Sequence, residues 1–232
     1  MPSRKVKAAE AAERSRRAFL LGLAGLGAAG AGVVGVASWL FQRQPRLPSV
    51  AIVLREGWGA APANIDGSIE GRYDAQLNPD GYLVYDKPLT VALKDLIVHH
   101  TATGFDATPA DIQRLHMQDR GYADVAYHYL IGADGTIYEG RVLGARGAHT
   151  GGRNTGSIGV SLFGNFEDLT PTVAQLDSLW RLAGALTYDF WLERLGGHRD
   201  YQPGATVCPG ANLWPLLPDL AQACAVSLVR SA

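Results

Sequence analysis

Two histidines and one cysteine are placed where they could share a metal ion. His99 lies at the end of the short apolar run DLIVHH, and His198 precedes Cys208 with nine residues between them. Two imidazoles and one thiolate form a ligand set that binds Zn²⁺ and leaves a fourth position open. Zinc in such a site polarises a carbonyl and lowers the pKa of water toward neutrality, which produces a usable nucleophile. The spacing alone leaves another interpretation open, in which His99 is a hydrogen-bonded strand end and Cys208 a small buried residue.

Four other residues of these types have a simpler explanation than ligation. His100 follows His99 on one predicted strand and points to the opposite face, which favours a supporting or substrate-binding role. His116 falls in the apolar register of a predicted helix and His128 in a predicted strand, so both are predicted to pack in the interior. Cys224 lies among leucines of the last predicted helix and is interpreted as buried filler.

Short apolar runs and turn residues predict an alternation of strands and helices. Strands are predicted at 95–100, 126–131, 136–139 and 157–163. Asp134-Gly135, between the middle two, indicates a hairpin because this pair tolerates positive φ. Helices are predicted from Thr108, from Thr170 and from Trp214 to Val229, the first two opened by threonine and proline. Strands interleaved with three helices indicate an α/β sheet covered by helices.

Five segments, taken together and in order, resemble the zinc-dependent N-acetylmuramoyl-L-alanine amidases of the type-2 amidase and peptidoglycan recognition protein family, which includes the phage T7 lysozyme amidase. They are REGWGA at 55–60, IVHHTA at 97–102, GYADVAYHYLIGADGTIYEG at 121–140, GAHTGGRNTGSIGVSLFGNF at 147–166, and GHRD at 197–200 with CPG at 208–210. The resemblance implies a central mixed β-sheet flanked by about three helices. A polar, turn-rich stretch at 64–90 either shapes the substrate cleft or covers the sheet edge.

The resemblance also implies an activity. The family cleaves the amide that joins the lactyl group of N-acetylmuramic acid to L-alanine, the first residue of the stem peptide. His99, His198 and Cys208 would then be the ligands of Zn²⁺, and peptidoglycan would be the substrate. Tyr127 matches the catalytic tyrosine, whose phenol would donate to the oxyanion of a tetrahedral intermediate. One such donor is typically worth about 3 kcal/mol.

Further residues match the family by position. Thr206, two residues before the cysteine, falls where the family has lysine or threonine beside the metal. His149 and Asn154 lie in the segment that lines the family's cleft, and together with His100 they are the expected substrate-binding residues. The loop between the second and third ligands is about two residues longer than in the T7 enzyme, with Pro203-Gly204 inside it. This longer loop affects the match of Thr206 to the family position, and it does not change which residues are the expected ligands.

Two other functions compete with metal-dependent hydrolysis. Some members of this family bind peptidoglycan without cutting it, and they characteristically lack the cysteine ligand. Cys208 is present here, which favours an enzyme. A hydrolase with a covalent cysteine nucleophile paired with histidine is the second alternative.

The first 46 residues have the pattern of an export signal. They hold eight basic and two acidic residues, and Ala18–Gln42 is uncharged and rich in Leu, Ala, Gly and Val. A basic region before an apolar run is typical of such signals, and Ser15–Leu20 (SRRAFL) resembles the twin-arginine signal. A membrane anchor is the alternative, because about 20 apolar residues span a bilayer. Both place the domain at 47–232 outside the cytoplasm, in the cell envelope, the periplasm or the medium, and they differ in whether it is released.

The charge of the remaining chain argues against a nucleic-acid partner. The net charge of −1 over 232 residues conceals 13 basic and 20 acidic residues after position 46. Nucleic-acid affinity depends on lysines and arginines that neutralise phosphates. Two cysteines cannot form a disulfide framework, so the core must come from apolar burial, for which the chain is long enough.

Overall fold

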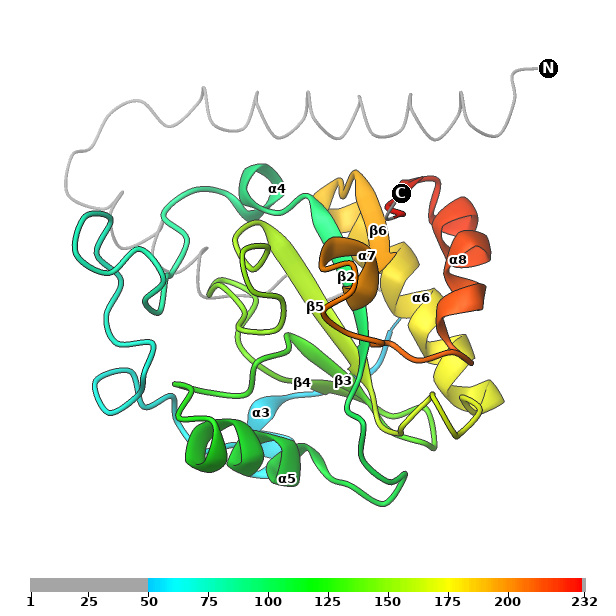
Figure 1. Ribbon diagram of the computed structural model, residues 1–232, viewed down its shortest axis with the longest axis horizontal. Coiled ribbons are helices and arrows are strands. Elements are labelled where there is room, and N and C mark those ends of the chain that lie inside the picture. Colours follow the sequence, from blue (N-terminus) through cyan, green and yellow to red (C-terminus); the bar gives the residue numbers. More distant parts are fainter. Residues whose placement is uncertain (1–49, 231–232) are drawn as a thin grey trace. The chain divides into compact units, whose positions relative to one another are not determined.

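Seven strands form one mixed sheet in residues 50–230, the part of the chain that the computed structural model describes (Figure 1). Their order is β1 (Ile52–Val53), β4 (Ile137–Glu139), β3 (Tyr129–Ile131), β5 (Ser157–Leu162), β2 (Asp95–His100), β6 (Arg194–Gly197) and β7 (Ser227–Leu228). Neighbouring strands are parallel except β3 and β4, which are antiparallel. The mixed sheet confirms the α/β architecture expected from the sequence.

The strand β2 lies between β5 and β6, and its run Leu96-Ile97-Val98 is fully buried. Parallel strands covered on both faces are continuous apolar runs, which explains why DLIVHH is so visible in the sequence. In the pairing of β2 with β6, Val98 lies opposite Gly197. The next residues, His99 on β2 and His198 directly after β6, therefore lie at the same end of the sheet, although they are far apart in the chain.

The predicted hairpin is present, but its first strand is shorter than expected. It begins at Tyr129, so Tyr127 lies in the segment before the strand. That segment is nevertheless fixed by backbone hydrogen bonds. The Tyr127 carbonyl accepts from the N–H of Arg141 at 2.8 Å, and the N–H of His128 donates to the Gly159 carbonyl at 2.9 Å.

Two helices, α6 (Val173–Phe190) and α8 (Leu217–Cys224), lie together on one side of the molecule (Figure 1). The helix α6 begins two residues later than predicted, because Thr172 and not Thr170 is its N-cap. Thr172 and Gln175 exchange side-chain and backbone hydrogen bonds at 3.0 and 3.1 Å, a capping box that satisfies N–H groups of the first turn. The buried face of α6 includes Leu179, Leu182 and Leu186.

The prediction for the last helix is wrong at the C-terminal end, because the helix does not continue to Val229. A 3₁₀ turn at Trp214–Leu216 leads into α8, which ends at Cys224. Ala225 follows with a φ of 56°, in the left-handed region that stops a helix. The chain then adds β7 to the sheet, and the N–H of Val229 donates to the Leu195 carbonyl at 2.7 Å. Pairing with a free sheet edge therefore replaces the last helical turn.

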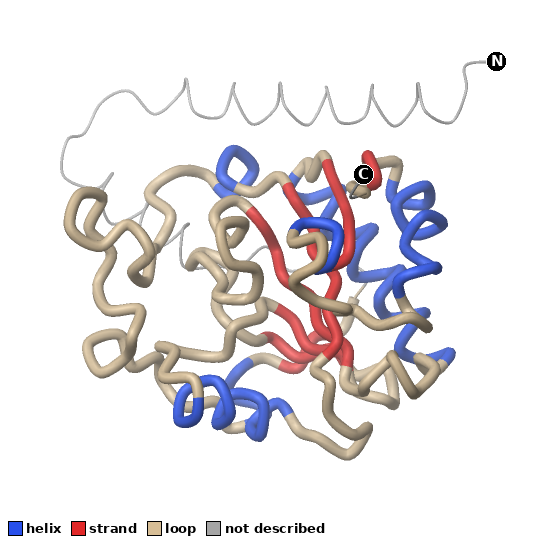
Figure 2. The backbone as a smooth tube through the Cα atoms, viewed as in Figure 1, coloured by secondary structure: helices blue, strands red, loops and turns tan. Residues whose placement is uncertain are grey.

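The helix α5 (Pro109–Arg114) begins as predicted, at a distance from α6 and α8 (Figure 2). The Thr108 hydroxyl accepts from the N–H of Asp111 at 3.2 Å, and the Asp111 carboxylate accepts from the N–H of Thr108 at 3.1 Å. A π-helical turn, Leu115–Asp119, continues α5 and carries His116. Such turns are frequent at functional sites.

Three short helices complete the described part of the chain: α3 (Arg55–Trp58), α4 (Leu89–Ala92) and α7 (His198–Tyr201). Within residues 50–230, none of the helices combines the length and the apolar character needed to cross a membrane. The predicted export signal or anchor, residues 1–46, lies outside the described residues and stays a prediction.

Candidate metal centre

Three side chains from separate parts of the chain meet at the C-terminal end of β2. His99 is the penultimate residue of that strand, His198 opens α7 directly after β6, and Cys208 follows the loop beyond α7. One ligand atom from each residue lies within 4.8 Å of the other two. The Sγ atom of Cys208 is 3.6 Å from Nδ1 of His99, and the rings of His99 and His198 have centroids 4.8 Å apart. The predicted ligand set is therefore brought together.

Burial controls the protonation of these three groups. It lowers the pKa of His99 well below its usual range, and the neighbouring His149 and His198 lower it further. It also lowers the pKa of His198. Both imidazoles are therefore neutral at pH 7, as metal ligation requires. Burial raises the pKa of the Cys208 thiol to about 12, so without a cation the thiol keeps its proton.

Hydrogen bonds assign the nitrogen that His99 presents to Cys208. The Nε2 atom of His99 lies 3.1 Å from Nδ1 of His149, whose Nε2 is 3.4 Å from the Ser157 hydroxyl. That hydroxyl donates its single hydrogen to the Arg153 carbonyl at 2.8 Å, so it accepts from His149. Nδ1 of His149 is then an acceptor, and Nε2–H of His99 donates to it. The lone pair of His99 Nδ1 faces Cys208.

A cavity of about 330 Å³ is lined by His198 and Cys208 and by most of the other predicted site residues, while His99 lies buried beside it. It brings together residues from β2, the π-helical turn, the segment before β3 and the loops 147–156 and 202–208. Its polar and aromatic lining includes His100, Thr101, His116, Arg120, Tyr122, Tyr127, His149, His198, Thr206 and Cys208.

Tyr127 and Thr206 line the same cavity as His198 and Cys208, two of the three predicted ligands. The Tyr127 ring centroid is 5.1 Å from that of His99 and 5.4 Å from that of His116. Burial raises the pKa of Tyr127, so its phenol is a hydrogen-bond donor at neutral pH. The Thr206 hydroxyl accepts from the N–H of Cys208 at 3.1 Å, which leaves its own hydrogen available to the cavity.

The three predicted substrate-binding residues have different positions. His149 lines the cavity but is buried and turned toward His99. Asn154 supports the same loop, because its side-chain oxygen accepts from the N–H groups of His149 and Thr150 at 2.8 and 2.7 Å. His100 lines the cavity, and its Nδ1 accepts from the N–H of Phe166 at 3.1 Å. Contact of these side chains with substrate stays a prediction.

His116 is buried as predicted, and its side chain also lines the cavity. Its Nδ1 accepts from the N–H of Ala126 at 3.1 Å, and burial lowers its pKa to about 3. A π-helical turn holds more residues than an α-helical turn, so the α-helical register does not predict that His116 reaches the cavity. Arg120 and Tyr122, which no pattern in the sequence indicates, also line this cavity.

The predicted burial of His128 is confirmed, and that of Cys224 is confirmed in part. His128 is buried in the interior, where Nδ1 accepts from the N–H of Gly159 at 2.9 Å and Nε2 lies 3.0 Å from the Ala145 carbonyl. Cys224 is half-buried and packs against the main core cluster.

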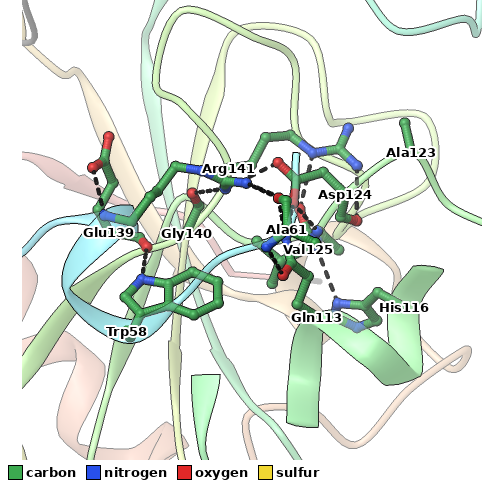
Figure 3. Close-up of polar contacts among 12 residues, drawn as sticks. Trp58, Ala61, Gln113, His116, Ala123, Asp124, Val125, Glu139, Gly140 and Arg141 are labelled. Atoms are coloured by element: carbon green, nitrogen blue, oxygen red, sulfur yellow. Dashed lines mark hydrogen bonds and ion pairs between the residues drawn. The ribbon is translucent and has the colours of Figure 1, made fainter. Parts of the chain in front are cut away.

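A buried polar network fixes the segment that precedes Tyr127 (Figure 3). Arg141 is fully buried, and its Nε and Nη2 donate to the carbonyls of Val125 and Asp124 at 2.9 and 3.2 Å. The same guanidinium forms a bidentate ion pair with Glu70 at 2.6 and 2.7 Å. Glu70 belongs to the stretch 64–90, of which no described residue lines the cavity. This stretch therefore braces the wall of the site from behind.

The REGWGA segment has a structural role in the same network (Figure 3). Arg55 forms an ion pair with the Asp124 carboxylate at 3.0 Å, and the Gln113 side chain donates to that carboxylate at 2.7 Å. Trp58 donates through its indole N–H to the Glu139 carbonyl at 2.8 Å. The segment thus joins α5, β4 and the residues before Tyr127.

The fold and the site together define a class of protein. A mixed sheet carries two neutral imidazoles and a thiol at the end of its central strands, beside a tyrosine in an open cavity. Two nitrogens and one sulfur suit borderline-soft divalent cations and leave room for a further ligand, as in catalytic metal sites.

The chain belongs to the type-2 amidase and peptidoglycan recognition protein family. The family model for N-acetylmuramoyl-L-alanine amidase matches residues 90–211. Peptidoglycan-recognition protein SC2 of Drosophila melanogaster is 34% identical over 178 residues, which cover 71% of this chain and 83% of that protein.

Solved structures of proteins from this family are also similar to the chain. The endolysin N-acetylmuramoyl-L-alanine amidase LysCS from Clostridium intestinale is 31% identical with a TM-score of 0.54, covering 62% of this chain and 93% of that one. Peptidoglycan recognition protein LE in complex with tracheal cytotoxin, a monomeric diaminopimelic acid-type peptidoglycan, is 29% identical with a TM-score of 0.57, covering 73% and 93%. The family therefore contains both an amidase and a recognition protein at similar distance from this chain.

Proposed function

We propose that the protein is a zinc-dependent N-acetylmuramoyl-L-alanine amidase that hydrolyses the bond between N-acetylmuramic acid and the L-alanine of the stem peptide. The observation that carries the proposal is the meeting of His99, His198 and Cys208 beside Tyr127, next to a cavity that His198, Cys208 and Tyr127 line. A muropeptide is the substrate class, in keeping with a relative of this family that is solved with tracheal cytotoxin.

The residues at the site have two separate roles in this proposal: some bind the cation, and others donate hydrogen bonds to the substrate amide. His99, His198 and Cys208 would hold Zn²⁺, which supplies Lewis acidity and lowers the pKa of water when bound. Tyr127 donates its phenolic hydrogen to the oxygen of the attacked carbonyl, which becomes negatively charged in the transition state. The Thr206 hydroxyl is oriented by the N–H of Cys208 and adds a second donor on the same side.

Binding of peptidoglycan without cleavage is the second candidate function, because recognition proteins of this family are as similar to the chain as the amidase is. The complete ligand set favours the enzyme, since family members that only bind characteristically lack the cysteine. A covalent Cys208 mechanism is disfavoured by the burial that keeps this thiol protonated in the absence of a cation.

Chelation followed by metal restoration separates these functions. We expect a chelator to abolish amide cleavage and added Zn²⁺ to restore it, and we expect His99→Ala and Cys208→Ala to be inactive. Activity that survives chelation would support the thiol mechanism and contradict the proposal. Stoichiometric zinc uptake without cleavage of any muropeptide would support the recognition function instead.

We further propose that this activity is exercised outside the cytoplasm, on the cell envelope where peptidoglycan lies. Support comes from the basic and apolar pattern of residues 1–46. Fractionation of cells that express the full chain tests the proposal, and recovery of the protein in the cytoplasm alone would contradict it.

A further inference from the structure

Gln202 connects one metal-site histidine to a loop from a different part of the chain. It is the C-cap of α7, four residues after His198, so the two side chains share a helix face. The side-chain oxygen of Gln202 lies 2.7 Å from Nε2 of His198. Its side-chain nitrogen donates to the carbonyl of Gly151 at 2.9 Å. Gln202 is half-buried between the two partners.

The Gly151 carbonyl decides the direction of both hydrogen bonds. A backbone carbonyl only accepts, so the amide nitrogen of Gln202 must face Gly151 and its oxygen must face His198. The oxygen accepts, and therefore Nε2 of His198 carries the hydrogen. The lone pair of His198 is then on Nδ1, the same nitrogen that His99 presents to Cys208.

Both histidines of the site thus receive their orientation from one loop. Gly151 belongs to the stretch that also carries His149, the acceptor for Nε2–H of His99. The loop is itself held closed by the Asn154 side chain. Partners of this kind fix the tautomer and the ring position of metal-ligating histidines, and their loss typically costs 10–100-fold in metal affinity.

We propose that Gln202 is a positioning residue of the metal site, which holds His198 with Nδ1 toward the cation and couples that histidine to the loop at Gly151. The role rests on the proposed zinc site, and it adds a residue that the three ligands and Tyr127 do not include. Gln202 acts through His198 and touches neither the cation nor the scissile amide.

Two substitutions distinguish two possible roles of Gln202. One role is to accept a hydrogen bond from His198, and the other is only to support the loop at Gly151. Gln202→Met keeps the length of the side chain and removes both hydrogen bonds. Gln202→Glu keeps an acceptor for His198 and loses the donor to Gly151. Gln222→Met changes an exposed glutamine on α8 in the same way and serves as the matched control.

The readouts are zinc affinity, measured by competition with a chromogenic chelator, and the visible absorption spectrum of the Co²⁺-loaded protein. We expect Gln202→Met to bind zinc about 10–100-fold more weakly and to alter the cobalt spectrum. Gln202→Glu and Gln222→Met should stay within about threefold of the unmodified protein. Melting temperatures of the metal-free proteins verify that each variant folds.

Unchanged affinity and an unchanged spectrum in Gln202→Met would overturn the positioning role, while zinc binding by the unmodified protein would leave the proposed function intact. An equal loss in Gln202→Glu and Gln202→Met would also overturn it, because the loop contact and not the acceptor would then matter. Failure of the unmodified protein to bind zinc would overturn the proposed function, and this role with it.

Discussion

Nε2 of His99 donates to Nδ1 of His149 across 3.1 Å, and both rings are buried. The contact turns His149 away from the role that its position in a cleft-lining segment suggests. Its Nδ1 is occupied by His99 and its Nε2 lies against Ser157, so its polar atoms are used within the protein. We therefore expect His149 to support His99, a ligand of the proposed metal site, rather than to contact substrate.

The change His149→Ala distinguishes these two roles. If His149 supports His99, zinc affinity falls by about 10–100-fold, as for other residues that orient a ligand. If it contacts substrate, KM rises while zinc affinity stays constant. Zinc titration and steady-state kinetics on the zinc-saturated variant measure both quantities, and a KM effect with normal affinity would refute the support role.

The phenol of Tyr127 is predicted to act on the transition state alone. Tyr127→Phe keeps the ring against His99 and removes the donor, so kcat should fall about 100-fold, or about 3 kcal/mol, with zinc affinity unchanged. Tyr188→Phe, at an exposed position on α6, is the matched control. A Tyr127→Phe enzyme within twofold of full activity would remove the tyrosine from the proposed chemistry.

The buried ion pair between Arg141 and Glu70 is predicted to be essential for stability. Arg141→Met leaves the Glu70 carboxylate without its partner behind the site, which should lower the free energy of unfolding by about 3–5 kcal/mol. Chemical denaturation measures this. Arg72→Met breaks a pair with Asp66 that has similar geometry on the exposed surface, and should leave the melting temperature nearly unchanged. Equal effects in both variants would contradict the argument from burial.

Acid should destabilise the metal-free protein before its carboxylates titrate. Burial lowers the pKa of His116 to about 3 and that of His128 to about 4. Because these native pKa values lie below that of an unfolded histidine, about 6.5, the stability they confer is present above pH 6.5 and lost as the pH falls toward 4. Between pH 7 and pH 5, the contribution of each of these two histidines to the free energy of unfolding should fall by about 2 kcal/mol. Urea unfolding at the two pH values tests this, and equal stability at both would contradict it.

The sequence predicts the parts of the site that lie on regular structure. His99 is predictable because a fully buried parallel strand is an unbroken apolar run that ends in polar residues. The convergence of His99 with His198 and Cys208 depends on the order β5-β2-β6, which no local pattern reveals. The family resemblance supplied that information in advance.

Other residues depend on geometry that periodicity does not contain. The cavity position of His116 depends on a π-helical turn, and the role of Gln202 depends on a contact with Gly151 across 51 positions of the chain. The end of α8 was missed because an open sheet edge competes there with the helix. Partners distant in sequence decide each of these cases, so a local pattern cannot predict them.

The most direct test of the whole account is mass analysis of the products that the zinc-loaded protein releases from purified muropeptides. We expect free stem peptides with an N-terminal L-alanine, together with glycan fragments that end in an intact lactyl group. Muropeptides that are bound but recovered uncut, or that are cut within the peptide or between the sugars, would contradict it.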